Sequence, residues 1–87
     1  MVTQDPITMS VADAIGMTVE QAESQPKTAA RRAAAVLRNN GFERRACHLA
    51  WERGSRWYKS GSNTPLPDLC ATSILGVALL SGEISEK

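Results

Sequence analysis

Hydrophobic residues between positions 26 and 40 recur every three or four positions, which is the spacing of one face of an α-helix. Pro26 suits the first position of a helix, and Gly41 suits the residue just beyond its end. The pattern therefore predicts a long helix from about Pro26 to Asn40, packed on Val11, Ile15 and Phe42. Its apolar face consists of Ala29, Ala30, Ala33, Val36 and Leu37.

The residues before this helix predict an extended start followed by two short helical segments. The stretch "ITM" from Ile7 contains a β-branched residue, and we expect it to be extended. Ser10, with a carboxylate three residues later, predicts the start of a helix that ends at Gly16. Thr18 begins a second segment of this kind, "TVEQAE", with a glutamine in the position that completes a capping box.

After Gly41 the sequence changes to a pattern typical of strands. The stretches "FERRACHLAW" and "SRWYKS" are rich in aromatic and strand-compatible residues and are separated by "ERGS", which predicts a β-hairpin over residues 42–59. Successive residues of a strand face opposite sides, so one of Trp57 and Tyr58 should face the core and the other outward. An outward ring, or Trp51, would suit stacking on nucleic-acid bases, although such aromatic residues more commonly form the core of a hairpin.

A second apolar segment follows Pro65 and Pro67 and predicts a helix over residues 66–81. It is apolar almost all round between Asp68 and Leu80, so we expect it to be buried on more than one side. One interpretation is that it takes the place of the helix that normally precedes the first strand of a winged helix. The alternative is that residues 69–80 contact a second copy of the chain or a parent protein.

The order of these elements predicts an α+β fold of the winged-helix type. Eighty-seven residues can close one modest core, so we expect a single domain over residues 1–87. Residues 11–41 would form the helix-turn-helix, residues 42–59 a two-stranded wing, and residues 66–81 an added C-terminal helix.

The charges are strongly segregated, although the net charge is only +1. Nine of the ten basic residues lie between Lys27 and Lys59, and no acid interrupts the polar face of the long helix. Such a face predicts a nucleic-acid partner bound through arginine–phosphate contacts. Duplex DNA is favoured over single-stranded DNA as this partner. The predicted DNA-binding residues are Lys27, Thr28, Arg31, Arg32, Arg38, Arg44, Arg45, Arg53, Arg56 and Lys59.

Position along the long helix divides these candidates by role. Thr28, Arg31 and Arg32 lie near its start and would reach base edges, whereas Arg38 and the arginines that follow Gly41 would contact the phosphate backbone. Two alternatives remain open for the basic face: it is a solvated surface, or it pairs with the acidic first 26 residues. A third is a protein-interaction module, such as a phage-encoded inhibitor or an assembly adaptor, with arginines scattered over several faces and an exposed apolar C-terminal helix.

The remaining chemistry predicts a non-enzymatic protein without cofactor or metal. Cys47 and His48 are adjacent, which is poor chelate spacing, and Cys70 is expected to pack as a small hydrophobic residue. The low cysteine content and the lack of a secretory signal pattern predict a cytoplasmic location. The longest apolar stretch, "ATSILGVALL", is half of the roughly 20 residues that span a bilayer, so no membrane anchor is expected.

The run "RRAAAVLRNNGFERR", followed by a hairpin that ends in "RWYK", resembles the C-terminal segment of virulence-associated E-like proteins, which are phage- and plasmid-borne primase-helicases. The upstream "VADAIGM" is similar to the helix that precedes this segment in the family. The resemblance covers Val11 to Lys59, with Phe42 where the family usually has tryptophan. It implies a winged-helix DNA-binding module associated with the replication of mobile elements.

Overall fold

The structure is a computed structural model that describes residues 7–46 and 54–84. These residues form four α-helices and a two-stranded antiparallel sheet, so the expected α+β class is confirmed. Cys47, His48, Trp51 and Arg53, which belong to the predicted hairpin, lie outside the described residues. In chain order the elements are α1 (Met9–Ala14), α2 (Val19–Ser24), α3 (Pro26–Asn39), β1 (Phe42–Ala46), β2 (Ser55–Lys59) and α4 (Ala71–Leu80).

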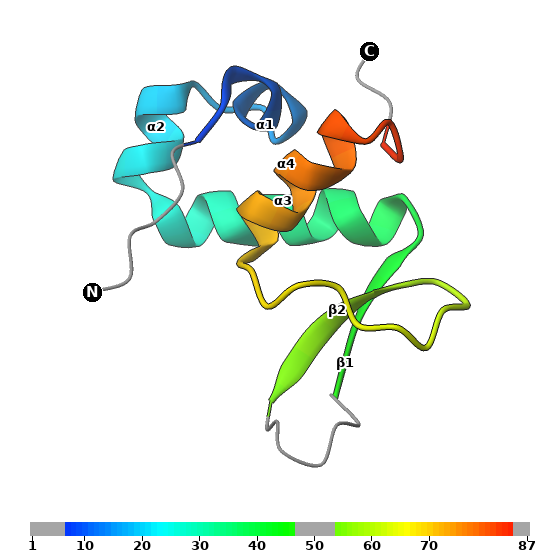
Figure 1. Ribbon diagram of the computed structural model, residues 1–87. Helices are drawn as coiled ribbons and strands as arrows, with labels where there is room; N and C mark the ends of the chain where they lie inside the picture. The colour runs from blue at the N-terminus through cyan, green and yellow to red at the C-terminus, as the bar shows by residue number, and fades with distance from the viewer. Residues whose placement is uncertain (1–6, 47–53, 85–87) are drawn as a thin grey trace.

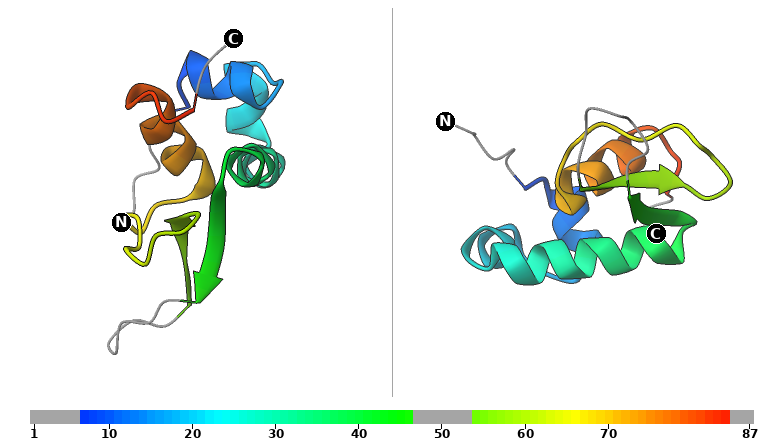
Figure 2. Two further views of the ribbon diagram at one scale, coloured as in Figure 1. Left: turned by 90° about the vertical axis from the view of Figure 1, so that its right-hand side faces the viewer. Right: turned by 90° about the horizontal axis from the view of Figure 1, so that it is seen from below.

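Helix α3 is the central element, and α1, α2, α4 and β1 all contact it (Figure 1). It begins with Pro26 and ends at Asn39, within one residue of the predicted bounds. Gly41 follows with a φ of 85°, a left-handed conformation that glycine adopts without strain and that turns the chain into β1. Seen end-on, α3 has α1 and α2 above it, α4 on one side and the hairpin below (Figure 2).

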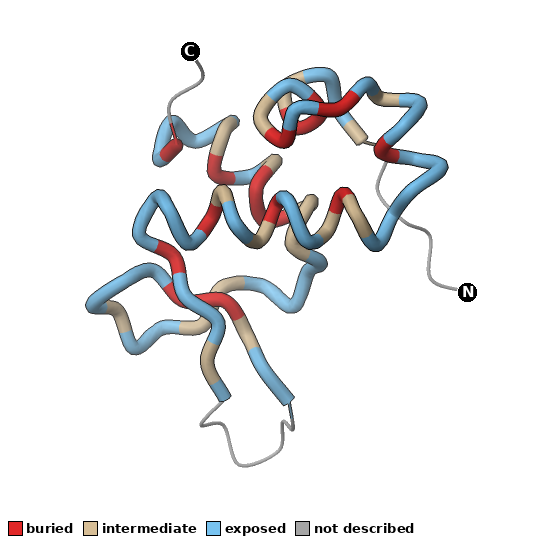
Figure 3. The backbone as a smooth tube through the Cα atoms, turned by 180° about the vertical axis from the view of Figure 1, so that it is seen from behind, coloured by how far each residue is buried: buried red, intermediate tan, exposed pale blue. Residues whose placement is uncertain are grey.

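The hydrophobic core lies where α3 meets α1, α4 and the hairpin (Figure 3). Ala29, Ala33 and Leu37 are completely buried on the predicted inner face of α3. The predicted packing of this face with Val11, Ile15 and Phe42 is also confirmed. Helix α4 adds the buried residues Ile74, Leu75 and Ala78.

The two N-terminal helices begin with threonine caps. The Thr8 hydroxyl accepts a hydrogen bond from the backbone N–H of Val11 at 3.2 Å, so α1 starts at Met9. Thr8 has the extended backbone predicted for "ITM", but Met9 is already helical. The predicted start at Ser10 was wrong, because the Thr8 hydroxyl and not that of Ser10 caps the first turn. The predicted start of α2 is confirmed: Thr18 and Gln21 form both hydrogen bonds of a capping box, at 3.0 and 3.1 Å.

Both aromatic residues of β2 are buried, on opposite faces of the hairpin. Trp57 belongs to the core below α3, as expected for one of the pair. Tyr58 lies on the other face, as strand alternation predicts, but it is only 1% exposed, so it is not accessible for stacking on bases. Residues 60–66 fold back over this face: Pro65 forms a bridge with Tyr58, and the Leu66 N–H donates to the Trp57 carbonyl at 2.9 Å. The alternation of side chains along a strand does not reveal whether a later segment will fold back over its outer face.

Helix α4 starts at Ala71, later than predicted, because Pro67 to Leu69 form a turn in which the Leu69 N–H donates to the Pro67 carbonyl at 2.8 Å. The helix packs on both α3 and α1, which confirms its burial on more than one side. Its outer face remains open, with Val77 52% and Leu80 90% exposed. Within the described ranges, no helix combines the length and the apolar composition needed to cross a membrane.

Candidate nucleic-acid interface

Eight of the nine clustered basic residues are described, and seven of them divide into two groups. The first group, which we call the open basic stripe, comprises Lys27, Arg31, Arg38 and Arg44. All four side chains are exposed, and none forms an ion pair or hydrogen bond with a described residue. Their charge is therefore available to an external anion.

Helix geometry aligns the three members that lie on α3. Spacings of four and seven residues correspond to about one and two turns, so Lys27, Arg31 and Arg38 follow one side of the helix. This side faces away from the buried line formed by Ala29, Ala33 and Leu37. The stripe is thus fixed by the same periodicity that builds the core.

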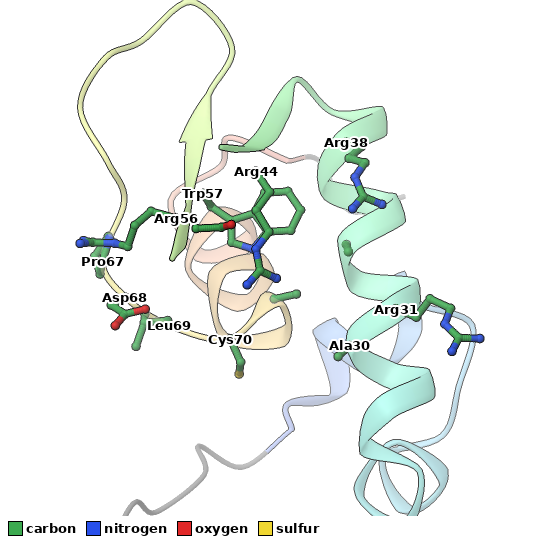
Figure 4. Close-up of a pocket in the computed structure, with 13 residues that line it drawn as sticks. Ala30, Arg31, Arg38, Arg44, Arg56, Trp57, Pro67, Asp68, Leu69 and Cys70 are labelled. Atoms are coloured by element: carbon green, nitrogen blue, oxygen red, sulfur yellow. The ribbon is translucent and has the colours of Figure 1, made fainter. Parts of the chain in front are cut away.

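Arg44 extends the stripe onto the hairpin. It pairs with Trp57 across the two strands and therefore lies on the same face of the sheet as that ring. Its side chain projects into a groove between β1, α3 and the start of α4 (Figure 4). At the other wall, the guanidinium of Arg38 lies 5.8 Å from the centre of the Trp57 ring, within cation–π range.

The second group holds the fold together. On α3, Arg32 Nη1 donates to the carbonyl oxygens of Ile15 and Gly16, at 3.3 and 3.4 Å. These carbonyls follow the last turn of α1, where backbone acceptors lack helical partners and a cation is favourable. Arg32 therefore connects α1 to α3, a role that its position on the polar face of α3 does not reveal.

Arg45 and Arg56 attach the returning segment to the outer face of the hairpin. The Arg45 guanidinium lies 4.0 Å from the centre of the Tyr58 ring, donates to the Ser62 carbonyl, and forms an ion pair with Glu43 at 3.3 Å. Arg56 donates to the Leu66 carbonyl from Nε at 3.0 Å and from Nη2 at 2.6 Å. Both guanidiniums thus occupy backbone acceptors of residues 60–66.

The remaining candidates are less open than the stripe. Lys59 forms an ion pair with Glu83, which joins β2 to the residues after α4. Thr28 is half-buried in the first turn of α3, and Arg53 lies outside the described residues. The acids of α1 and α2 are exposed, and in residues 7–46 and 54–84 none of them pairs with the open basic stripe.

Cys70 is exposed at the position just before α4, so the prediction that it packs as a small hydrophobic residue was wrong. Its Sγ lies 3.2 Å from the Thr72 hydroxyl and 3.3 Å from the Ser73 hydroxyl. Partial burial raises the pKa of this thiol, but hydrogen bonds from Ser73 and Thr72 outweigh that effect, and the pKa falls below its ordinary value of 9.0. Among the described residues, no group of three His, Cys, Asp or Glu side chains could hold a metal ion.

Comparison with known proteins assigns no family to this arrangement: no protein-family model, curated protein or solved structure matches the chain. The similarity to virulence-associated E-like proteins therefore stays a prediction, as do the DNA contacts of the ten residues.

The adjacent residues Arg31 and Arg32 test the division into two groups. Arg32→Gln should lower the free energy of unfolding by about 1 kcal/mol, because it removes hydrogen bonds to the end of α1. Arg31→Gln should change it by less than about 0.5 kcal/mol, as for an ordinary surface position. Urea denaturation of both variants measures the difference. Equal losses would contradict the structural role of Arg32.

The Cys70 thiol should react at lower pH than an unperturbed cysteine. Because its pKa is lowered, the Cys70 thiol loses its proton at a lower pH than an ordinary cysteine. Only the resulting thiolate is nucleophilic. In a Cys47→Ser background, the alkylation rate should rise with pH at a lower midpoint than in a short reference peptide. Ser73→Ala should move the midpoint back up. A midpoint at or above that of the peptide would refute the hydrogen-bonding account.

Proposed function

We propose that this chain is a winged-helix module that binds duplex DNA through the open basic stripe and serves the replication or regulation of a phage- or plasmid-type element. The order of short helices, long helix and antiparallel hairpin supports this assignment. In winged-helix proteins the long helix enters the major groove and the hairpin lies against the neighbouring backbone. Here α3 and the β1–β2 hairpin take those roles.

The observation that carries the proposal is that the stripe has no anionic partner in the described part of the chain. Surface helices usually mix acids with their arginines at spacings of three or four, because such pairs stabilise the helix. On α3 the stripe residues face solvent without such pairs. Phosphate groups relieve the repulsion between these charges and release condensed counterions on binding.

Within the stripe, the position of each residue along the chain suggests whether it contacts a base or a phosphate. Arg31 lies in the first half of the helix and is the candidate for a base edge, since a guanidinium can bind guanine with two hydrogen bonds. Lys27, Arg38 and Arg44 supply phosphate contacts. Arg32, Arg45 and Arg56 act in support, because they hold α1 and residues 60–66 against the elements that carry the stripe.

The salt dependence of DNA affinity tests this assignment. Each phosphate contact adds about 0.9 to the slope of the logarithm of affinity against the logarithm of salt concentration, so Arg38→Gln, which removes one such contact, should reduce the slope by about 1 and weaken binding. Arg32→Gln should leave the slope unchanged at temperatures where that variant is fully folded. Fluorescence anisotropy with a labelled random-sequence duplex at several salt concentrations provides the measurement.

Two outcomes would count against the proposal. If the wild-type chain fails to bind duplex DNA even at low salt, DNA binding is excluded as its function. If Arg38→Gln and Arg32→Gln reduce the slope equally, the charge acts diffusely and the stripe is not the interface.

A second candidate function is protein–protein interaction. It is favoured by exposed apolar side chains on α4 and in the segment just before this helix. Leu69, Val77 and Leu80 are 38%, 52% and 90% exposed, and they line a hollow of about 170 Å³ together with Ile7. Large exposed apolar groups that lie together mark contact surfaces. Leu69 also lines the groove that Arg44 enters, whereas Ile7, Val77 and Leu80 do not, so a contact centred on α4 is compatible with DNA bound at the stripe.

Sedimentation tests whether this surface joins two copies of the chain. In that case the wild-type protein should form dimers at high concentration, and Leu80→Glu should shift it to monomers by placing a charge in the contact. Asn63→Glu adds the same charge at an exposed site outside the hollow and should leave the dimer intact. A wild-type chain that stays strictly monomeric would exclude the dimer.

A further inference from the structure

The groove that receives Arg44 has a lining that combines arginine side chains with apolar surface. Its volume is about 420 Å³, and its walls come from α3, from both strands, and from the segment that leads into α4. This lies within the roughly 300–1,000 Å³ typical of small-molecule sites. A water molecule occupies about 30 Å³ of liquid, so the groove exceeds the needs of a bare inorganic anion.

The charges of the groove favour a phosphate group. Arg44 projects into its centre, and Arg38 lies along the wall over the Trp57 ring (Figure 4). Neither guanidinium has an anionic partner among the described residues. The Arg31 guanidinium, by contrast, points away from the groove in the same view. Two guanidiniums that line one groove supply the positive charge and the hydrogen-bond donors that a phosphate accepts.

The other lining residues favour a ligand in which the phosphate is attached to a planar, partly apolar group. Ala30, Ala34 and Leu69 give the groove smooth apolar walls, and the small alanines leave the floor open as far as Trp57. Asp68 supplies the one carboxylate among its lining residues. A carboxylate at a mainly cationic site suits a ligand that carries hydrogen-bond donors as well as negative charge, such as a base with an amino group or a sugar hydroxyl.

We propose that this groove binds a single nucleotide unit, with its phosphate on Arg44 and Arg38 and its base against Ala30, Ala34 and Leu69. The inference rests on the proposed function, since it places a strand end or a free nucleotide beside the duplex-binding stripe. A duplex cannot enter a hollow of this size, whereas one nucleotide can. Groove binding and duplex binding therefore share Arg38 and Arg44, and a variant that changes the shape of the groove without changing its charge separates the two.

The test is a titration of the full chain with deoxyadenosine monophosphate, followed by the Trp57 indole and Arg44 Nε–Hε NMR signals. Ala34→Leu fills the groove without changing any charge and should weaken binding at least about tenfold, whereas Ala35→Leu, on the exposed side of the same helix, should change it less than about twofold. Arg44→Gln should weaken binding about tenfold through the lost charge-assisted contact. This variant also serves if Ala34→Leu fails to fold.

Comparison ligands decide whether both halves of the nucleotide are recognised. Deoxyadenosine and inorganic phosphate should each bind more weakly than the nucleotide by about tenfold or more. Equal binding of either one, or nucleotide binding that ignores Ala34→Leu, would overturn the assignment. If the wild-type chain binds duplex DNA but no nucleotide, the groove inference fails while the proposed function stands. The opposite result would remove the duplex function and leave the groove site.

Oligonucleotides distinguish the two sources of the ligand. A 5′-phosphorylated single strand that binds more tightly than the free nucleotide, and loses that advantage in Ala34→Leu, identifies a strand end. If Ala34→Leu affects only the free nucleotide, the ligand is a free nucleotide.

Discussion

The close packing of α3 against its neighbours through small side chains is the interaction on which the rest of the structure depends. Ala29 and Ala33 are completely buried, and Leu75 of α4 is buried with them in the same core. On α4, a Cβ added to Gly76 would lie 3.4 Å from a methyl group of Val11, so α4 and α1 also approach closely. Helices approach most closely where the side chains at the contact are small.

This packing fixes the orientation of every charged side chain on α3. With one side of the helix committed to the core, the long basic side chains must lie at its edges or on the opposite side. Arg32, at an edge, reaches the carbonyl oxygens at the end of α1, whereas Arg31 faces solvent. Neighbouring residues of the same type thus acquire different roles from their angular position alone.

The hairpin divides its arginines by the same logic, with a period of two instead of 3.6. Arg44 lies on the face of Trp57 and projects into the groove, whereas Arg45 lies on the face of Tyr58 under the returning segment. Because residues 60–66 cover that second face, its guanidiniums bind backbone oxygens of the same chain. The open charge is thereby concentrated on the side of the hairpin that meets α3.

Local signals predicted much of this fold from the sequence. Pro26 and Gly41 bounded α3 to within one residue, and the capping box at Thr18 began α2 as expected. The start of α1 was misplaced, because Thr8 and Ser10 both offer a capping hydroxyl and only the tertiary structure selects between them. The late start of α4 depends on a turn after Pro67 that composition does not specify.

The sequence predicted which basic residues belong to the candidate site, but not which of them are open to solvent and which hold the fold together. Sequence spacing placed the basic residues together, yet it could not show which guanidiniums would find acceptors inside the molecule. Those acceptors are backbone carbonyls of Ile15, Ser62 and Leu66, which come close only after α1 and residues 60–66 have folded into place. The groove beside Trp57 likewise arises from four separate segments of the chain.

The central claim is that the arginines form an open group and a structural group, and that only the open group meets DNA. The most direct measurement follows the arginine Nε–Hε NMR signals while duplex DNA is added to the folded chain. The account predicts that the signals of Arg31, Arg38 and Arg44 shift or broaden, while those of Arg32, Arg45 and Arg56 stay in place. Uniform changes across all six signals, or changes confined to the second group, would contradict it.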